Sequence, residues 1–279
     1  MAIKDILFPI IGHPEATPAG CAGQAVALAA ALGAEVTALR VDAGIAVPAN
    51  VLANALLDLP GMVNEARARA AAAAQARVDE FREALGGAPL LSTLSCPEAC
   101  LGELLVAHAR VHDLTLLPLA GPGGPLAELA EQVVFGAGRP VLLLPPRDPP
   151  GPGLVGAPAV VAWDRSRPAA RAVADALPLL AHAASVHVVT VTEDKPLPAP
   201  AEPAGLVRNL ARHGIAATHD TVPRGGRPVG EALATAAAER GAGLLVMGAF
   251  GHSRVRDFIL GGATQALLRA PPLPILLSH

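Results

Sequence analysis

The sequence predicts an α/β protein made of two doubly wound parallel sheets, each with about five strands. Short, nearly all-apolar runs alternate with helix-like stretches along the chain, and this alternation indicates a parallel sheet with helices on both faces. The order of elements is the same before and after a segment rich in proline and glycine, residues 145–158. Such a segment disfavours both helix and central strand. We therefore expect one domain over residues 1–146 and a second over residues 158–279.

The first half contains apolar runs that predict strands, separated by alanine-rich or amphipathic stretches that predict helices. The predicted strands cover residues 6–11, 36–41, 90–94, 114–119 and 140–144. The predicted helices cover residues 19–32, 61–85, 97–111 and 126–134. Glycines at 121–124 mark the loop before the last helix.

The second half repeats this order with a shortened third element. Residues 195–203 are rich in proline, so that only residues 204–213 predict a helix there. The predicted strands cover residues 160–163, 186–191, 218–222, 244–247 and 274–277. The other predicted helices cover residues 168–183, 228–240 and 264–269.

The composition argues against several classes of function. The formal net charge is -3 and no basic run is present, which argues against nucleic acid as a partner. Lysine occurs only at Lys4 and Lys195, which argues against most Schiff-base and phosphate-lysine mechanisms. The apolar stretch 19–39 contains Gln24, Gly33 and Glu35, so a core helix and strand are favoured there over a membrane span. With no signal-peptide layout at the start, we expect a cytoplasmic protein.

Glycines after the predicted strand 244–247 indicate an anion site. Gly248 and Gly251 would let the backbone pass close to a ligand and expose its amides. Ten residues after Gly251, a helix opens with Gly261, Gly262, Ala263 and Thr264, and free amides at a helix N-terminus attract anions. The two glycine groups could together close around a polyphosphate. His252, Ser253 and Arg254 are placed to supplement those amides.

This motif resembles that of the universal stress protein family. Its nucleotide-binding members carry Gly, two residues, Gly, nine residues and Gly, followed by Ser or Thr. Gly248, Gly251 and Gly261 match this spacing, and Thr264 matches the second hydroxyl position. Gly262 departs from the pattern and removes one hydroxyl. The resemblance implies a Rossmann-like fold of the nucleotide α-hydrolase type and a regulatory protein of the stress response that binds ATP, or AMP or ADP, with Mg²⁺ as a companion ion.

The resemblance extends to the first strand of the second half. Residues 160–168 are similar to the family's strand-Asp-x-Ser start, which implies that Asp164 contacts the adenine end of the nucleotide. The same resemblance places Val191 and Met247 against the base. Asp164 could instead cap the helix 168–183, but Ser166 fits that position better, with Pro168 close behind it. We therefore expect Asp164 to be available to the ligand.

The first half departs from the family pattern. Residues 9–12 replace the strand-Asp start with an apolar sequence, and the spacing between glycines 121–124 and residues 135–138 is broken. Pro122 also has no N–H to offer to a phosphate. We interpret residues 1–146 as a degenerate repeat without a nucleotide site.

Two further groupings are interpreted as structural. His108 and His112 lie one helical turn apart, but no third metal ligand is evident and His112 lies at a helix end. Cys96 and Cys100 have the wrong spacing for a redox pair, and three cysteines in a chain of this length do not suggest a disulfide framework. We expect no metal site.

No general base can be named beside residues 248–264, so we do not expect an enzyme. Slow ATP turnover is not excluded by this argument. The alternatives are a slow ATP-hydrolysing or adenylating enzyme on the same fold, and a structural adaptor without a ligand. Because edge strands seek partners, we expect strands 141–144 and 275–277 to pair and form an internal pseudo-dimer. The whole protein would then be a monomer or a homodimer.

Overall fold

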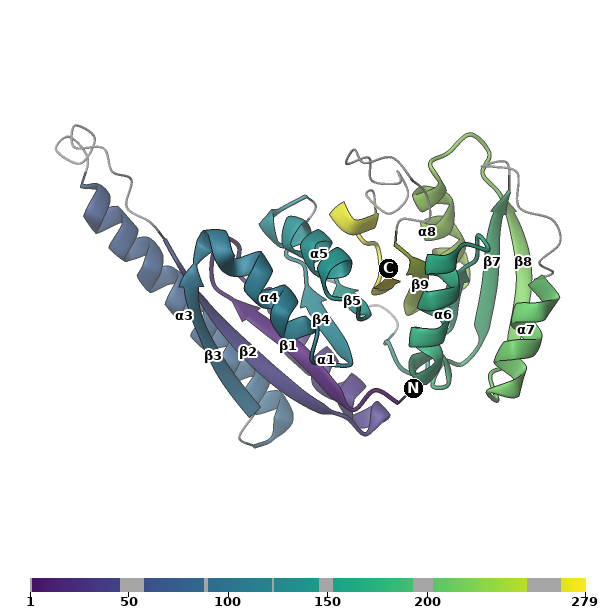
Figure 1. Cartoon of the computed structure of the whole chain (residues 1–279), viewed down its shortest axis with the longest axis horizontal. Coiled ribbons are helices and arrows are strands. Elements are labelled where there is room, and N and C mark those ends of the chain that lie inside the picture. The colour runs from purple at the N-terminus through teal and green to yellow at the C-terminus, as the bar shows by residue number, and fades with distance from the viewer. Residues whose placement is uncertain are drawn as a thin grey trace.

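The computed structural model describes residues 2–45, 58–87, 90–121, 123–145, 153–192, 203–249 and 267–279 (Figure 1). The first half contains β1 (Asp5–Ile11), α1 (Cys21–Leu32), β2 (Glu35–Gly44), α3 (Leu59–Leu85), β3 (Leu90–Pro97), the 3₁₀ turn η1 (Glu98–Cys100), α4 (Leu101–Ala109), β4 (Leu114–Pro118), α5 (Pro125–Gly136) and β5 (Val141–Leu144). The second half contains β6 (Ala159–Ala162), α6 (Arg167–Leu180), β7 (Val186–Thr192), α7 (Pro203–Arg212), β8 (Ala217–Pro223), α8 (Val229–Glu239), β9 (Leu244–Gly248) and β10 (Ile275–Ser278). The α/β class is confirmed.

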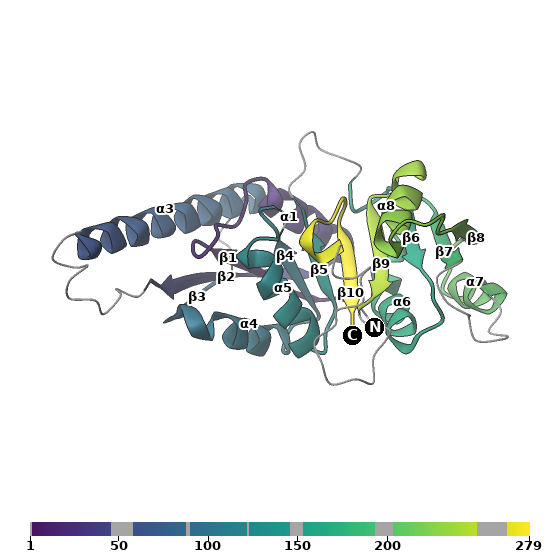
Figure 2. The same ribbon diagram turned by 90° about the horizontal axis from the view of Figure 1, so that it is seen from above.

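All of these strands belong to one ten-stranded sheet with the order β3-β2-β1-β4-β5-β10-β9-β6-β7-β8. Within each half the paired strands are parallel, whereas β5 and β10 pair antiparallel, with Leu276 opposite Leu142 (Figure 2). The second half therefore mirrors the strand order of the first half. The predicted pairing of the two final strands within one chain is confirmed.

Helices cover both faces of the sheet, as Figure 2 shows. One core lies under α4, α5 and α8, with Leu105, Leu129 and Leu233 among its buried members. The other core lies under α1, α3, α6 and α7, where Phe8 of β1 stacks on Phe81 of α3 with ring centroids 5.6 Å apart. Burial on both faces explains why the central strands are nearly continuous apolar runs instead of alternating sequences.

The long helix α3 has clear local signals at both ends. The Asp58 side chain accepts a hydrogen bond from the Gly61 N–H at 3.0 Å, and Pro60 lies in the first turn, where its missing N–H costs nothing. At the other end Gly86 adopts a left-handed conformation with φ 66°, which closes the helix. The sequence prediction for residues 61–85 is therefore confirmed to within two residues at the start of the helix.

Several boundaries differ from the sequence predictions. Strands β2 and β3 extend to Gly44 and Pro97, because their parallel ladder continues to those residues. The predicted helix 97–111 is instead η1 followed by α4, which ends at Ala109. In the second half α6 ends at Leu180, and 3₁₀-type bonds tighten the following turn. Within the described part of the chain, no helix is both long and apolar enough to cross a membrane.

Candidate functional site

The carboxyl ends of β9, β6 and β7 bring three of the predicted site residues to one edge of the sheet. These strands are neighbours in the order β9-β6-β7 and run parallel, so their carboxyl ends face the same way. Met247 lies near the end of β9, Asp164 follows β6, and Val191 lies near the end of β7. From β6 the chain adds strands on one side (β7, β8) and then on the other (β9, β10), so the topological switch point lies between β9 and β6. Ligands of open α/β sheets bind at such a point.

The carboxylate of Asp164 holds the turn between β6 and α6. Its Oδ1 accepts a hydrogen bond from the Ser166 N–H at 2.9 Å, and the Ser166 hydroxyl accepts one from the Ala169 N–H at 3.2 Å. The prediction that Ser166 caps α6 is therefore confirmed. Asp164 also has a local role that the sequence did not predict, because a short acidic side chain readily binds the amide two residues ahead.

Gly248 has a packing function that the sequence did not reveal. A Cβ atom at this position would overlap the backbone of Pro168 and Ala169, at the start of α6. The end of β9 and the N-terminus of α6 therefore touch only because residue 248 has no side chain. This contact brings the first glycine of the predicted motif directly beside the turn that contains Asp164.

The other predicted site residues lie outside the part of the chain that the structure describes. They are the second glycine of the motif, the three residues after it, and the predicted start of the last helix: Gly251, His252, Ser253, Arg254, Gly261, Gly262, Ala263 and Thr264. The described residues on each side of them are Ala249, whose N–H donates to the Ser278 carbonyl at 2.8 Å, and the buried Leu267.

A polar network behind the Asp164 turn was missed by the sequence analysis. The buried Thr190 hydroxyl donates to the Trp163 carbonyl oxygen at 3.0 Å. Because its single hydrogen is used there, the Nε2–H of His219 donates to Thr190 Oγ1, at 3.1 Å. Burial lowers the pKa of His219 below its ordinary value, Asp220 acts in the opposite direction, and Arg165 lowers it further. The only sequence signal was the alternation of Thr190 and Thr192 with valine, which places polar groups on one face of β7.

The turn after β6 also contains a backbone outlier. Arg165 has φ 66°, in the left-handed region that disfavours residues with a Cβ atom. It lies between Asp164, which binds the next amide, and Ser166, which caps α6. Two side-chain hydrogen bonds therefore hold a conformation that costs about 1 kcal/mol or more.

The corresponding helix end in the first half is occupied by a carboxylate of the chain itself. Helix α5 begins after Gly124, and Glu15 Oε2 accepts a hydrogen bond from the Leu126 N–H at 3.1 Å. A Cβ atom at Gly124 would lie 2.5 Å from the same carboxylate oxygen. By strand register, Ile11 stands where the second half has Asp164, and its side chain is buried. The first half thus has neither the acidic residue nor an open helix end.

The histidine and cysteine pairs take the local roles that were favoured for them. His112 Nδ1 lies 2.8 Å from the His108 carbonyl oxygen, at the end of α4, so its ring interacts with the helix end. Cys96 and Cys100 are free thiols at the junction of β3 and η1. Among the described residues, no three metal-ligating side chains come together.

The comparisons with known proteins agree with this fold. Residues 158–279 match the model of the universal stress protein family. A universal stress protein from Archaeoglobus fulgidus is similar over 98% of this chain and 95% of its own, with a TM-score of 0.69 and 17% identity. A putative universal stress protein from Pseudomonas aeruginosa is similar over 99% of this chain and 93% of its own, with a TM-score of 0.57 and 16% identity. No curated protein matches the chain in sequence. At these identities the solved structures support the fold of the whole chain.

Proposed function

Since residues 158–279 belong to the universal stress protein family, we propose that this half binds an adenine nucleotide and that the protein regulates a stress response. The ligand is ATP, or AMP or ADP, with Mg²⁺ as a companion of the phosphates. Binding would change the conformation of the protein or its interaction with a partner. The family and the sheet topology support a stress-response protein with a nucleotide-binding fold.

One observation supports the site more than any other: Asp164, Val191 and Met247 lie at neighbouring strand ends, and the Gly248–Thr264 motif begins there. The three residues come from separate parts of the sequence, and only the strand order β9-β6-β7 brings them together. The packing of Gly248 on the start of α6 puts the first glycine beside Asp164. A base between Val191 and Met247 would leave its phosphates near Gly248, where the glycine motif begins.

We propose that the first half does not bind this ligand. Ile11 takes the position of Asp164, and Glu15 supplies a negative charge at the start of α5, where a phosphate would otherwise bind. A second anion at this helix end would meet direct repulsion from the carboxylate.

No catalytic role is assigned to the residues at these strand ends. Slow ATP hydrolysis or adenylation is the alternative enzymatic function. A ligand-free adaptor is the second alternative. It is favoured by the structural role of Asp164, which holds the α6 turn, and by the packing role of Gly248.

The test is calorimetric titration of the full chain with ATP and Mg²⁺. Gly251→Val should abolish binding, because a branched side chain would block the backbone from the phosphates. Gly121→Val is the matched control, since a Cβ atom there meets no atom within 4 Å and the residue belongs to the degenerate glycine cluster of the first half. ATP binding that survives Gly251→Val, or that Gly121→Val removes, would contradict the proposed site. The absence of any binding would favour the adaptor, and release of phosphate during the titration would favour the enzyme.

A further inference from the structure

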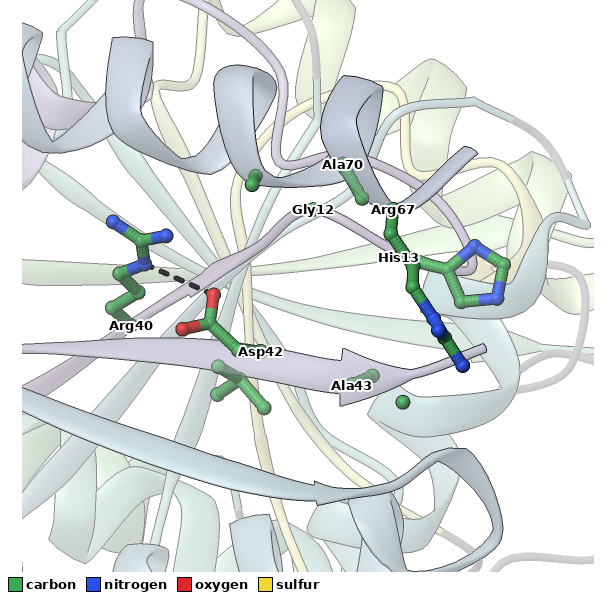
Figure 3. A pocket seen from close by; sticks show the side chains of 10 residues that line it. Gly12, His13, Arg40, Asp42, Ala43, Arg67 and Ala70 are labelled. Atoms are coloured by element: carbon green, nitrogen blue, oxygen red, sulfur yellow. Dashed lines mark hydrogen bonds and ion pairs between the residues drawn. The ribbon is translucent and has the colours of Figure 1, made fainter. Parts of the chain in front are cut away.

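A pocket of about 290 Å³ lies in the first half, between the carboxyl ends of β1 and β2 and the helix α3 (Figure 3). Its lining residues are Gly12, His13, Arg40, Val41, Asp42, Ala43, Gly44, Arg67, Ala70 and Ala71. The pocket exists because its walls carry small side chains on both the strands and the helix. A Cβ atom at Gly12 would overlap the Ala70 carbonyl, so the helix backbone closes directly over the end of β1.

The pocket lies on the opposite face of the sheet from the position that corresponds to Asp164. That position is Ile11, which packs in the core under α4 and α5 together with Val41. Side chains alternate along a strand, and Ala38 belongs to the other core, under α1 and α3. The side chains of Arg40 and Asp42 therefore face α3. The charged side chains of Arg40 and Asp42 thus lie on the other face of the sheet from Ile11, while Val41, the counterpart of Val191, also lines the pocket.

The charges of the lining side chains are unbalanced. Arg40 is held by Asp42, with Nε 3.0 Å from Oδ1, and it also donates to Gln75 Oε1 at 2.9 Å. Arg67 donates to the Ile45 carbonyl oxygen at 2.6 Å and forms no ion pair with a carboxylate among the described residues. Among the lining side chains two guanidinium groups thus face one carboxylate, a second carboxylate (Glu98) lies beside His13, and Arg67 is the guanidinium that pairs with neither.

Figure 3 shows Arg67 and His13 together at one end of the pocket, with the Arg40–Asp42 pair at the other end. His13 lies 3.2 Å from Glu98 of η1, which fixes its ring at the end of β1. A guanidinium group carries five N–H donors in a planar fork, and its carbonyl partner uses one of them. Arg67 can therefore donate to an anion while it keeps its bond to Ile45. Alanine side chains on α3 offer an apolar wall beside it.

We propose that this pocket binds a small organic anion, with its carboxylate or phosphate at Arg67 and His13 and its apolar body against Ala70 and Ala71. The volume lies at the lower end of the range for ligand pockets, about 300 Å³, which suits a single ring rather than a nucleotide. Charge-assisted bonds from a guanidinium to a carboxylate or phosphate supply the specificity.

The second half carries different residues at the strand positions that line this pocket. By strand register Thr190 takes the place of Arg40, and its hydroxyl is bound to the Trp163 carbonyl and to His219. Arg165 takes the place of Gly12, the position over which α3 closes in the first half. The guanidinium group of Arg40 and the bare backbone of Gly12 are therefore not repeated at the equivalent strand positions of the second half.

The experiment titrates the full chain with benzoate and with phenyl phosphate, and uses phenol as the neutral analogue. We expect one or both anions to bind and phenol not to bind. Arg67→Ala should raise the Kd by at least about tenfold, the usual effect of losing a hydrogen bond to a charged group. Arg69→Ala is the matched control, since Arg69 lies on the same helix with its side chain 72% exposed and paired with Glu65.

A second variant separates loss of binding from loss of folding. Ala71→Leu keeps every charged group and fills the pocket from an exposed helix position, so the anion affinity should fall while the thermal unfolding midpoint stays the same. Binding of phenol equal to that of benzoate would overturn the proposal, as would anion affinities that Arg67→Ala and Ala71→Leu leave unchanged. The absence of binding by both anions would overturn it too. Preference for phenyl phosphate over benzoate would identify a phosphate ligand, and the reverse order a carboxylate.

Discussion

Glu15 and Leu126, which are 111 residues apart in the sequence, meet at the start of helix α5, where Glu15 Oε2 accepts the Leu126 N–H at 3.1 Å. The carboxylate faces the positive end of the helix dipole and satisfies one of the amides that the helix itself cannot satisfy. It also joins the loop after β1 to the last helix of the first half. The first half therefore contains its own anion at the helix end that a phosphate-binding site of this kind would need to be empty.

Glu15→Ala should lower the free energy of unfolding by about 1 kcal/mol, the typical cost of losing a helix N-terminal cap. The measurement is urea unfolding followed by circular dichroism. Glu35→Ala is the control, because Glu35 is an exposed acidic residue in the same half and its side chain makes no hydrogen bond or ion pair within the described residues. Equal stability losses in the two variants would contradict the capping role.

Leu142→Ala should destabilise both halves together, because Leu142 is buried in β5 opposite Leu276 of β10. Truncation of a buried leucine costs about 2–5 kcal/mol. The protein has one tryptophan, Trp163, in the second half, so its fluorescence reports unfolding there while the substitution lies in the first half. We expect the urea midpoint from Trp163 fluorescence to fall.

The control for this experiment is Val111→Ala, since Val111 is also in the first half and is 73% exposed. It should change the free energy of unfolding by less than about 0.5 kcal/mol. A Trp163 midpoint that stays constant in Leu142→Ala, while circular dichroism shows an earlier transition, would mean that the halves unfold independently despite the shared sheet.

The fold was predictable because each element has a strong local signal. Apolar runs such as residues 114–119 have to be buried on both faces, and only a covered parallel sheet provides that. The pairing of β5 with β10 also followed from the sequence, because a final strand in each half leaves an unpaired edge. The extension of β2 to Gly44 was not predictable, since it depends on the ladder with β3 and not on local preference.

The candidate site was predictable only in part. The glycine spacing and Asp164 stand out in the sequence, but the packing of Gly248 against Pro168 becomes visible only when the helix is in place. Glu15 and Arg67 gave no signal at all, because isolated charges in a loop and on an exposed helix face are common. Their roles depend on contacts with Leu126 and with the ends of β1 and β2.

The cysteines should differ sharply in their reactivity toward iodoacetamide in the native protein. Cys21 is buried, and burial raises the pKa of its thiol to about 12, with a further increase from Glu80 and an opposing effect from Arg77. At pH 8 its thiolate fraction is therefore on the order of one in ten thousand. Cys100 is partly exposed and should react first. Peptide mass spectrometry over a time course measures both sites, and prompt labelling of Cys21 before Cys100 would contradict the native packing of α1.

Asp164→Ala separates the structural function of this carboxylate from its proposed contact with the base. Removal of Oδ1 breaks the bond to the Ser166 N–H, so the free energy of unfolding should fall by about 1 kcal/mol. Asp164→Asn keeps an oxygen that can accept this bond and should retain most of the stability. Ser166→Ala should cost a similar amount through the loss of the α6 cap, without removing the carboxylate.

Affinities for ATP and GTP, measured on the same three variants, give the second readout. If the carboxylate contacts the adenine end of the ligand, Asp164→Ala and Asp164→Asn should both reduce the preference for ATP over GTP. Alanine removes the hydrogen-bond acceptors that the base meets, and the amide of asparagine replaces one of them with a donor. Ser166→Ala should leave the preference intact, since it changes the helix cap alone. An ATP preference that persists in both Asp164 variants, together with the stability loss in Asp164→Ala, would mean that this residue holds the turn and does not select the base. The selectivity would then have to come from Val191, Met247 or the glycine loop.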